Sequence, residues 1–293
     1  MKIVSLEQGS QEWLAWRKTV ITGTDASIIM GSNPWDTPYT CWQRKLGLIE
    51  EKKSNEAMER GKRLEPEARA QFIERYGIEM IPAVVESSEF EFLGASLDGI
   101  TLLGGTILEV KCGGYKLHDM ATKGEIPSYY RDQMQHQLLV TGADKCCYYS
   151  YNGTDGICID VFPDPEYKAK FMPKARAFWK CVALNEPPAL QDSDYKDMSH
   201  EPLWKWAASE YRTICDQIED LEAIREKYRQ HILTLCGDQN CIGEGIRAMK
   251  TVMRGRVDYE AIPEIKDIDL DKYRKASTST WKILKHQLPP GIS

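Results

Sequence analysis

Two acidic residues and a lysine, Asp98, Glu109 and Lys111, stand at a spacing that suits metal-assisted hydrolysis of a phosphodiester. Ten residues separate Asp98 from Glu109, and among them Gly104-Gly105 marks a tight turn between two apolar runs. If the runs pair as strands, Asp98 approaches Glu109. Because side chains alternate along a strand, Glu109 and Lys111 share one face. Carboxylates gathered in this way favour a divalent cation as their partner.

Mg²⁺ or Mn²⁺ at this position would be bound by oxygen atoms, and the backbone carbonyl of Val110 can join the two carboxylates. Such an ion lowers the pKa of a bound water and offsets charge on a phosphate. Lys111 can orient that water or stabilise charge in the transition state. Glu65 could complete the shell of a second ion. The same spacing also fits a surface strand with cross-strand Glu–Lys pairs.

The composition indicates a folded enzyme-sized chain without membrane segments. It has 293 residues, 42% of them hydrophobic, enough for one large domain or for one domain with an appendage. We expect no signal peptide, and no apolar run approaches the length of a membrane span. The net charge of −6 excludes an overall basic surface, although it allows a local basic channel for nucleic acid.

The cysteines and histidines predict neither disulfides nor a zinc site. The nine cysteines include no C-x-x-C pair, and the five histidines show no H-x-x-x-H or H-E-x-x-H spacing. Reduced, mostly buried thiols in a cytosolic protein are the expectation.

The residue pattern predicts an α/β fold, a mixed sheet flanked by helices. Helices are expected over residues 10–18, 24–30, 40–46, 55–76, 128–141 and 163–184, and strands over 78–97, 106–111, 145–151 and 157–162. Pro66 should kink or divide its helix. Residues 112–127 form a loop and a poorly patterned stretch. On the helix that begins at Ser128, a buried glutamine among Gln133, Gln135 and Gln137 would need a polar partner.

Pro187-Pro188 marks the end of this region, and we place a boundary between there and about residue 200. Apolar residues then recur at three- and four-residue steps from Leu203 to Leu235, which predicts a long amphipathic helix. Residues 244–259 are typical of a hairpin that turns near Gly255. Its basic residues fit either a solvated surface or a face toward DNA.

A second candidate site lies at the start of the predicted helix 24–30. Thr24 is a plausible N-cap there, and Arg17 precedes it at the end of another helix. A helix N-terminus beside an arginine can bind a phosphate, because free backbone N–H groups and the helix dipole both favour an anion. A plain capped helix, with Arg17 in a surface ion pair, is the alternative.

Four stretches together resemble the YqaJ/lambda-exonuclease family of phage recombination nucleases, within the PD-(D/E)xK superfamily. Ser96-Leu97-Asp98 stands for the leading proline-aspartate, and Glu109-Val110-Lys111 is the E-x-K element. The four stretches occur in the family's order within about residues 5 to 190, and they are residues 16–27, 60–68, 97–112 and 130–142.

The resemblance implies a 5′-to-3′ exonuclease that digests double-stranded DNA from its ends and leaves 3′ single-stranded tails. Its cofactor would be Mg²⁺, with Mn²⁺ as a substitute and two ions bound. Asp98 and Glu109, with the carbonyl of Val110, are then the metal ligands. Lys111 is the water-activating lysine, and Glu65 is the helix carboxylate near the second metal.

The resemblance also assigns residues outside the E-x-K element. Gln133 is the helix glutamine of the site, and Arg17 and Thr24 fall where the family binds the 5′-phosphate of DNA. The family usually carries further basic or hydroxyl contacts in the loop after E-x-K. In this chain Lys116 is the one candidate for them.

Family resemblance further implies a ring-shaped homotrimer that works with a single-strand annealing recombinase in the cytoplasm of a bacterial host, without a membrane. Residues 1–190 would form the exonuclease core and residues 200–293 a helical and hairpin extension. Two other classes stay open. A PD-(D/E)xK endonuclease would cut closed circular DNA, and a non-catalytic accessory protein would bind DNA ends without releasing nucleotides.

Overall fold

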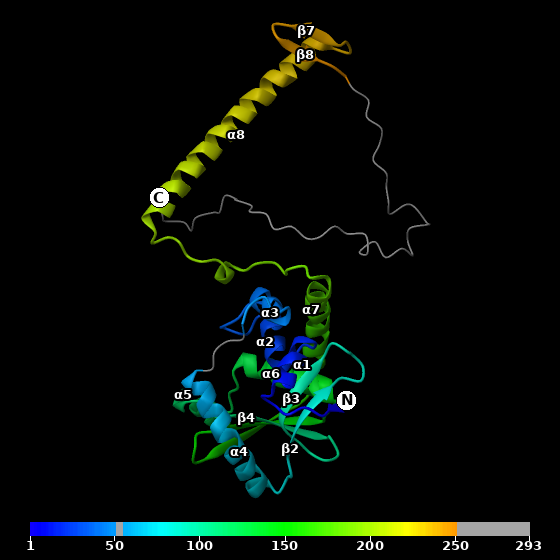
Figure 1. Ribbon diagram of the computed structural model, residues 1–293, viewed down its shortest axis with the longest axis vertical. Helices are drawn as coiled ribbons and strands as arrows, with labels where there is room; N and C mark the ends of the chain where they lie inside the picture. The colour runs from blue at the N-terminus through cyan, green and yellow to red at the C-terminus, as the bar shows by residue number, and fades with distance from the viewer. Residues whose placement is uncertain (51–54, 251–293) are drawn as a thin grey trace, which may run out of the picture. The chain divides into compact units, whose positions relative to one another are not determined.

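The computed structural model describes residues 1–50 and 55–250, and the chain divides into two compact units. The first unit, Met1–Lys196, contains one six-stranded sheet with helices on both of its faces (Figure 1). The predicted α/β class, a mixed sheet flanked by helices, is confirmed. The second unit begins at Asp197 and is described by itself below.

The strands of the sheet lie in chain order, from β1 at one edge to β6 at the other. Neighbouring strands pair antiparallel, except β4 and β5, which run parallel and therefore need a crossover between them. The predicted turn at Gly104-Gly105 joins β3 to β4, and Gly104 takes a positive φ of 74° there. The strands span Lys2–Val4 (β1), Ile81–Glu86 (β2), Gly94–Ile100 (β3), Thr106–Lys111 (β4), Lys145–Tyr151 (β5) and Gly156–Val161 (β6).

The helices of the first unit begin and end largely where caps predict. Ser10 caps the first helix through a hydrogen bond from the Trp13 backbone, and Gly142 ends the sixth in the left-handed conformation. The helices span Gln11–Lys18 (α1), Gly23–Met30 (α2), Pro38–Lys45 (α3), Glu56–Tyr76 (α4), Tyr115–Thr122 (α5), Ser128–Thr141 (α6) and Pro165–Leu184 (α7).

The two larger apolar cores lie on opposite faces of the sheet. On one face, α2, α6 and α7 pack against strand residues such as Leu97, Ile107 and Tyr148. On the other face, α4 packs against Leu108 and the strand residues next to it. Successive residues of β4 and β5 alternate between the two cores, as expected of strands buried on both sides.

Two expectations about helices are wrong, whereas Pro66 lies inside a helix that it does not divide. Helix α4 continues through Pro66 over 21 residues. Pro66 and Lys62, whose carbonyl loses its helical donor, are both exposed, so water can bind that carbonyl. The stretch expected to be irregular contains α5, a helix that buries only Ala121 and therefore shows little apolar pattern. The cap of α2 is Thr22, two residues before the predicted Thr24.

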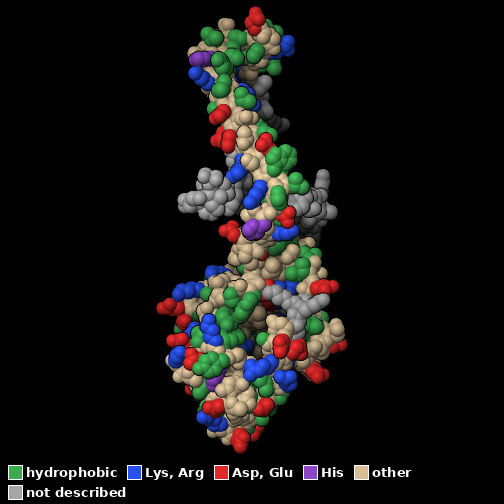
Figure 2. All heavy atoms as spheres, turned by 90° about the vertical axis from the view of Figure 1, so that its left-hand side faces the viewer, with side chains coloured by type: hydrophobic (Ala, Val, Ile, Leu, Met, Phe, Trp, Pro, Cys, Tyr) green, Lys and Arg blue, Asp and Glu red, His purple; other side chains and the backbone are tan. Residues whose placement is uncertain are grey.

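The second unit contains the predicted long helix, α8 (Pro202–Cys236), of 35 residues, which ends before Gly237. Its apolar residues are exposed, and Figure 2 shows hydrophobic side chains along it. Only residues 244–250 of the hairpin predicted at 244–259 are described. Strands β7 (Cys241–Gly243) and β8 (Ile246–Ala248) turn at Glu244-Gly245, both with positive φ. The predicted turn residue, Gly255, lies outside the described residues.

Within residues 1–50 and 55–250, no helix combines the length and the apolar character that crossing a membrane requires. All nine cysteines fall in these ranges, and each is a free thiol.

Candidate active site

Glu109, in the middle of β4, is the most buried acidic residue of the predicted site, with 1% of its surface exposed. Each of its carboxylate oxygens accepts hydrogen bonds. Lys111 Nζ and Gln133 Nε2 bind Oε1, the latter at 2.6 Å, and Gln137 Nε2 binds Oε2 at 2.5 Å. Three donors hold this carboxylate in a fixed orientation in the protein interior.

Asp98 lies beside Glu109 because the pairing of β3 with β4 stops one residue earlier. The last registered pair of these strands is Gly99 with Leu108. Beyond it, Asp98 Oδ2 accepts a 2.7 Å hydrogen bond from the backbone N–H of Val110. The side chain thereby takes the place of a strand partner, and the carboxylates of β3 and β4 lie together at the point where the strands separate.

Glu65 reaches the same place from α4. Arg69, one turn along the helix, forms an ion pair with Glu65 at 3.3 Å and donates a 2.8 Å hydrogen bond to the backbone carbonyl of Asp98. Arg69 therefore ties α4 to β3 at the site. The structure brings Asp98, Glu109 and Lys111 together, with Glu65 at the edge of the group.

The pKa values show the electrostatic cost of this arrangement. Burial, and then the negative charges of Glu109 and Glu65, raise the pKa of Asp98 well above its usual value. Burial and the Glu109 charge also raise the pKa of Glu65, although Arg69 opposes them. Burial alone would lower the pKa of Lys111, but the Glu109 and Asp98 carboxylates outweigh it and raise that pKa. The group holds more negative charge than its own cations neutralise.

Gln133 and Gln137 both point at Glu109 because residues four apart share a helix face. The sequence predicts a polar partner for a buried glutamine on α6 but does not identify it, and Gln137 is a site residue that sequence reasoning missed. Its remaining acceptor, Oε1, is buried without a hydrogen-bond partner among the described residues. Gln135 faces elsewhere and donates to the carbonyl of Phe162 at 2.7 Å.

Arg17 lies in the last turn of α1, and Thr24 lies in the first turn of α2. The guanidinium of Arg17 stacks over the Trp13 ring at 4.7 Å, on the last turn of α1. Thr24 is exposed on the first turn of α2, where backbone N–H groups are free of helical partners. The arrangement keeps the charge and the N–H groups that an anion site needs.

A buried network fixes the start of α2. Asp25 accepts hydrogen bonds from the backbone N–H and hydroxyl of Thr22 at 2.7 and 2.8 Å and from Lys45 Nζ at 2.6 Å. The same ammonium donates to the carbonyls of Arg17 and Val20, each at 2.6 Å. Burial would raise the pKa of Asp25, but Lys45 and then Arg17 lower it below its usual range. Lys45 therefore joins the end of α1 to the start of α2.

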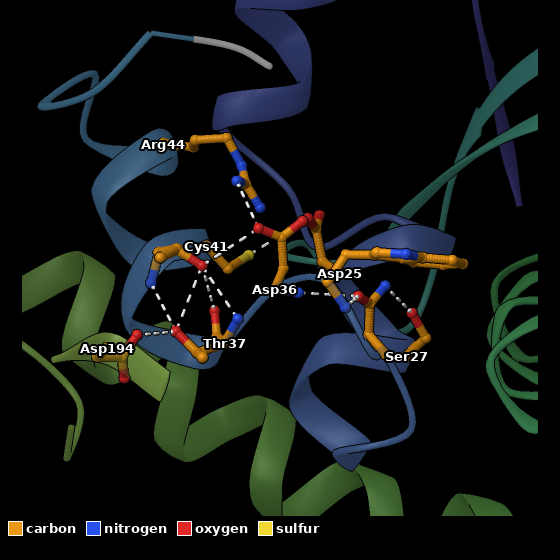
Figure 3. A network of polar contacts seen from close by, with 10 residues as sticks. Asp25, Ser27, Asp36, Thr37, Cys41, Arg44 and Asp194 are labelled. Atoms are coloured by element: carbon orange, nitrogen blue, oxygen red, sulfur yellow. Dashed lines mark hydrogen bonds and ion pairs between the residues drawn. The ribbon is translucent and has the colours of Figure 1, made fainter. Parts of the chain in front are cut away.

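The network continues along α3 (Figure 3). Cys41 donates its thiol to Asp25 at 3.4 Å, and Arg44 pairs with Asp36 at 3.0 Å. Thr37, which caps α3, donates its hydroxyl to Asp194 at 2.5 Å. The contacts of Cys41 and Lys45 with Asp25 hold α3 against the N-terminal end of α2.

Gly23 connects this candidate anion site to the carboxylate site. A Cβ atom at Gly23 would lie 2.7 Å from Cγ of Gln133, closer than real side chains allow. The first turn of α2 therefore rests directly on the glutamine that binds Glu109. Glycine is required here for a close approach, not for a special φ.

Lys116 lies in the first turn of α5 and is exposed, while the segment before it is held by a basic residue from α4. Arg60 donates to the carbonyls of Cys112 and Gly113, each at 3.1 Å, and to that of Asn152 at 2.8 Å. Arg60 thus fixes the loop that follows β4. Side chains of both charges and a hollow are visible on the face of the first unit that Figure 2 presents.

Comparison with known proteins agrees with this arrangement. Residues 12–144, which contain all the predicted site residues, match the family model described as the YqaJ-like viral recombinase domain. This part of the chain is similar to the YqaJ-like viral recombinase domain. The described β7–β8 hairpin lies outside the matched residues.

Two proteins are similar to this chain in sequence. The uncharacterized protein YqaJ of Bacillus subtilis is 27% identical over 299 residues, covering 94% of this chain and 92% of that protein. The uncharacterized protein R354 of Acanthamoeba polyphaga mimivirus is 28% identical over 161 residues, 50% of this chain and 29% of that protein.

Among solved structures, an alkaline exonuclease from Laribacter hongkongensis matches this chain with a TM-score of 0.53 and 25% identity. The match covers 60% of this chain and 94% of that one. The same exonuclease in complex with dAMP matches with the same score and identity, over 68% of this chain and 99% of that one. The recognition of an exonuclease-like recombination protein from sequence motifs is confirmed.

Proposed function

We propose that the protein is a Mg²⁺-dependent exonuclease that digests double-stranded DNA from its ends in the 5′-to-3′ direction and leaves 3′ single-stranded tails for recombination. The YqaJ-like viral recombinase domain and the similarity to an alkaline exonuclease support a DNA exonuclease acting in recombination. The observation that carries the proposal is the buried carboxylate of Glu109, held by Lys111, Gln133 and Gln137 beside Asp98.

The donor groups fit a hard divalent ion. Asp98 and Glu109 offer carboxylate oxygens beside the carbonyl of Val110, and Glu65 stands where it would serve a second ion. The raised pKa of Asp98 indicates crowded negative charge that a cation would relieve. Mg²⁺, for which Mn²⁺ can substitute, would activate water for attack and offset charge on the scissile phosphate when bound.

The protein's own side chains position the reacting groups. Lys111 Nζ lies on Glu109 Oε1 and 4.8 Å from the centre of the Tyr130 ring, so its ammonium has little freedom to move. It would donate a hydrogen bond to a phosphate oxygen or to the attacking water, and its charge would stabilise the transition state. Gln133 and Gln137 keep Glu109 in one orientation, which lowers the cost of reorganisation during reaction.

The start of α2 would bind the 5′-phosphate of the DNA end. Arg17 supplies charge, and the backbone N–H groups of the first turn, with the hydroxyl of Thr24, supply hydrogen-bond donors. Because Gly23 rests on Gln133, this anion site adjoins the carboxylates. A 5′-phosphate held there would set which phosphodiester reaches Lys111, and this accounts for cleavage from the 5′ end.

We further propose that three copies form a ring around DNA and that a single-strand annealing recombinase uses the tails, in the cytoplasm of a bacterial host. These two proposals follow from the family resemblance. Light scattering of the purified protein tests the trimer, and co-purification with a single-strand annealing recombinase tests the partner.

An assay on linear and circular duplexes, labelled at either terminus, tests the activity. With Mg²⁺, we expect mononucleotide release from the 5′-labelled strand of the linear duplex and no loss of the circle, and EDTA should stop the release. Cutting of the circle would instead identify an endonuclease. Binding of ends without any Mg²⁺-dependent release would identify an accessory protein.

A further inference from the structure

A cluster of metal-binding side chains lies on the face of the sheet opposite Glu109. In the register of β5 and β6, Cys147 pairs with Asp160, and Cys158 lies two residues earlier in β6, opposite Tyr149. Residues two apart on a strand project from the same face. One ligand atom from each of Cys147, Cys158 and Asp160 therefore gathers within 4.8 Å of the others.

We propose that Cys147, Cys158 and Asp160 bind a thiophilic divalent cation of the Zn²⁺ class. Two thiolates and one carboxylate oxygen suit Zn²⁺, with bonds of about 2.3 Å to sulfur and 2.0–2.2 Å to oxygen, whereas Mg²⁺ avoids thiolates. In a tetrahedral site, bonds of these lengths separate ligand atoms by less than the 4.8 Å limit observed here. Water completes the fourth position.

The charges around the cluster balance when such an ion binds. Lys145 Nζ forms an ion pair with Asp160 Oδ2 at 2.8 Å, and the Cys147 thiol donates to Asp160 Oδ1 at 3.5 Å. Two thiolates and one carboxylate then match the charges of a dication and the lysine.

An ion can reach the cluster from solvent. A cavity of about 300 Å³ adjoins it, walled by Phe72, Tyr76 and Ile78 from the end of α4 and the loop after it. Cys147 at the base of the cavity is 2% exposed, whereas the side chain of Asp160 is 41% exposed. The ligands therefore range from the exposed Asp160 to the buried Cys147, and water can reach the fourth coordination position of the ion.

The site is separate from the catalytic carboxylates. Cys147 belongs to the core beneath α4, while its neighbour Tyr148 belongs to the core on the opposite face and pairs in register with Glu109. Strand β6 is the edge of the sheet. An ion at the cluster would fasten this edge strand to β5, and so stabilise the sheet without taking part in hydrolysis.

Metal titration of the full chain tests the proposal. Cys236 and Cys241 also lie close to each other, so the double variant Cys236→Ser/Cys241→Ser serves as the background protein. After reduction and removal of metals, we expect one Cd²⁺ per chain to produce an ultraviolet thiolate absorption corresponding to two sulfur ligands, whatever further ions the carboxylate site binds. In the same background, Cys158→Ser should weaken binding about 100-fold and reduce that absorption.

Two further variants separate ligands from bystanders. Asp160→Asn should weaken Zn²⁺ binding about tenfold or more while the two-thiolate absorption remains. Cys181→Ser, on α7, should change neither quantity. Because a serine at Cys158 also changes packing against the core beneath α4, alkylation of the unmutated protein gives an independent measurement: Zn²⁺ should slow labelling of Cys158.

Absence of a thiolate absorption in the background protein would overturn the proposal. So would equal metal binding by Cys158→Ser and its background, or alkylation of Cys158 at the same rate with and without Zn²⁺. None of these outcomes depends on nuclease activity, so failure here leaves the proposed exonuclease function untouched.

Discussion

Gln137 Nε2 donates a hydrogen bond of 2.5 Å to Glu109 Oε2, and Gln133, one helical turn earlier, donates to the other oxygen at 2.6 Å. Two amides of α6 thus hold both oxygens of one buried carboxylate of β4. The helix carries no charge into the site, but it determines how the carboxylate faces Asp98 and Lys111. A ligand held in this way has its orientation set before substrate arrives.

Replacing Gln137 with leucine should weaken the response to Mg²⁺. The Oε2 atom of Glu109 loses its one protein donor, and loss of such partners typically costs about 10–100-fold in metal affinity. We expect the Mg²⁺ concentration for half-maximal activity to rise by about that factor. Gln135→Leu, on the same helix, should reduce stability but leave that concentration unchanged. An equal shift in both variants would remove Gln137 from the site.

The variant Lys111→Ala should abolish hydrolysis while DNA binding persists. The ammonium of Lys111 contacts Glu109, and in the proposed reaction its positive charge stabilises the transition state. Nucleotide release and gel-shift affinity, measured on the same linear duplex, check the two parts. Full nuclease activity in this variant would refute the assignment.

The variant Arg17→Ala should slow digestion of 5′-phosphorylated ends more than that of 5′-hydroxyl ends. The guanidinium contributes charge at the start of α2, and a hydroxyl end offers no charge to bind. Initial rates on the two substrates give the comparison. An equal loss on both would mean that Arg17 acts on folding or on the DNA duplex generally.

The variants Gly23→Ala and Gly61→Ala should have opposite effects. A methyl group at Gly23 meets Gln133 Cγ at 2.7 Å, so we expect a loss of about 1–3 kcal/mol in the free energy of unfolding and a fall in activity. At Gly61, in the interior of α4, nothing lies within 4 Å, and alanine should add about 0.5–1 kcal/mol. Chemical denaturation of both variants measures these changes, and a stable, active Gly23→Ala protein would contradict the close approach.

His136 should make the protein less stable in acid. It is fully buried, its Nδ1 has no partner in the described chain, and burial lowers its pKa from 6.5 to about 4. Below pH 6.5, His136 takes up a proton in the unfolded chain, whereas in the folded chain it stays neutral until the pH approaches 4. Its share of stability is therefore complete above pH 6.5 and is lost as the pH falls toward 4.

The comparison with His136→Gln isolates this effect from other titrating groups. Between neutral pH and about pH 4.5, the free energy of unfolding of the wild type should fall by about 2–3 kcal/mol more than that of the variant. Denaturant unfolding at a series of pH values provides the measurement. Parallel curves for the two proteins would show that His136 is not held neutral.

Turns, strand alternation and helix caps could be predicted from the amino-acid sequence, because they depend on residues that are close together in the chain. The turn at Gly104-Gly105, the alternation along β4 and the caps at Ser10 and Gly142 follow from side chains a few residues apart, and the structure agrees. The spacing of Asp98 and Glu109 across one hairpin is likewise a local property, so their approach could be predicted.

The contacts between segments that are far apart in the chain became known from the fold alone. Gln137 becomes a site residue because α6 packs over β4, and Gly23 matters because α2 packs on α6. Cys147 and Cys158 form no sequence motif, yet the pairing of β5 with β6 places their sulfurs beside Asp160. Such contacts depend on the packing of whole elements, which periodicity does not encode. Pro66 shows the converse: the helix continues through it, and Lys62, whose carbonyl loses its helical donor, is exposed to solvent.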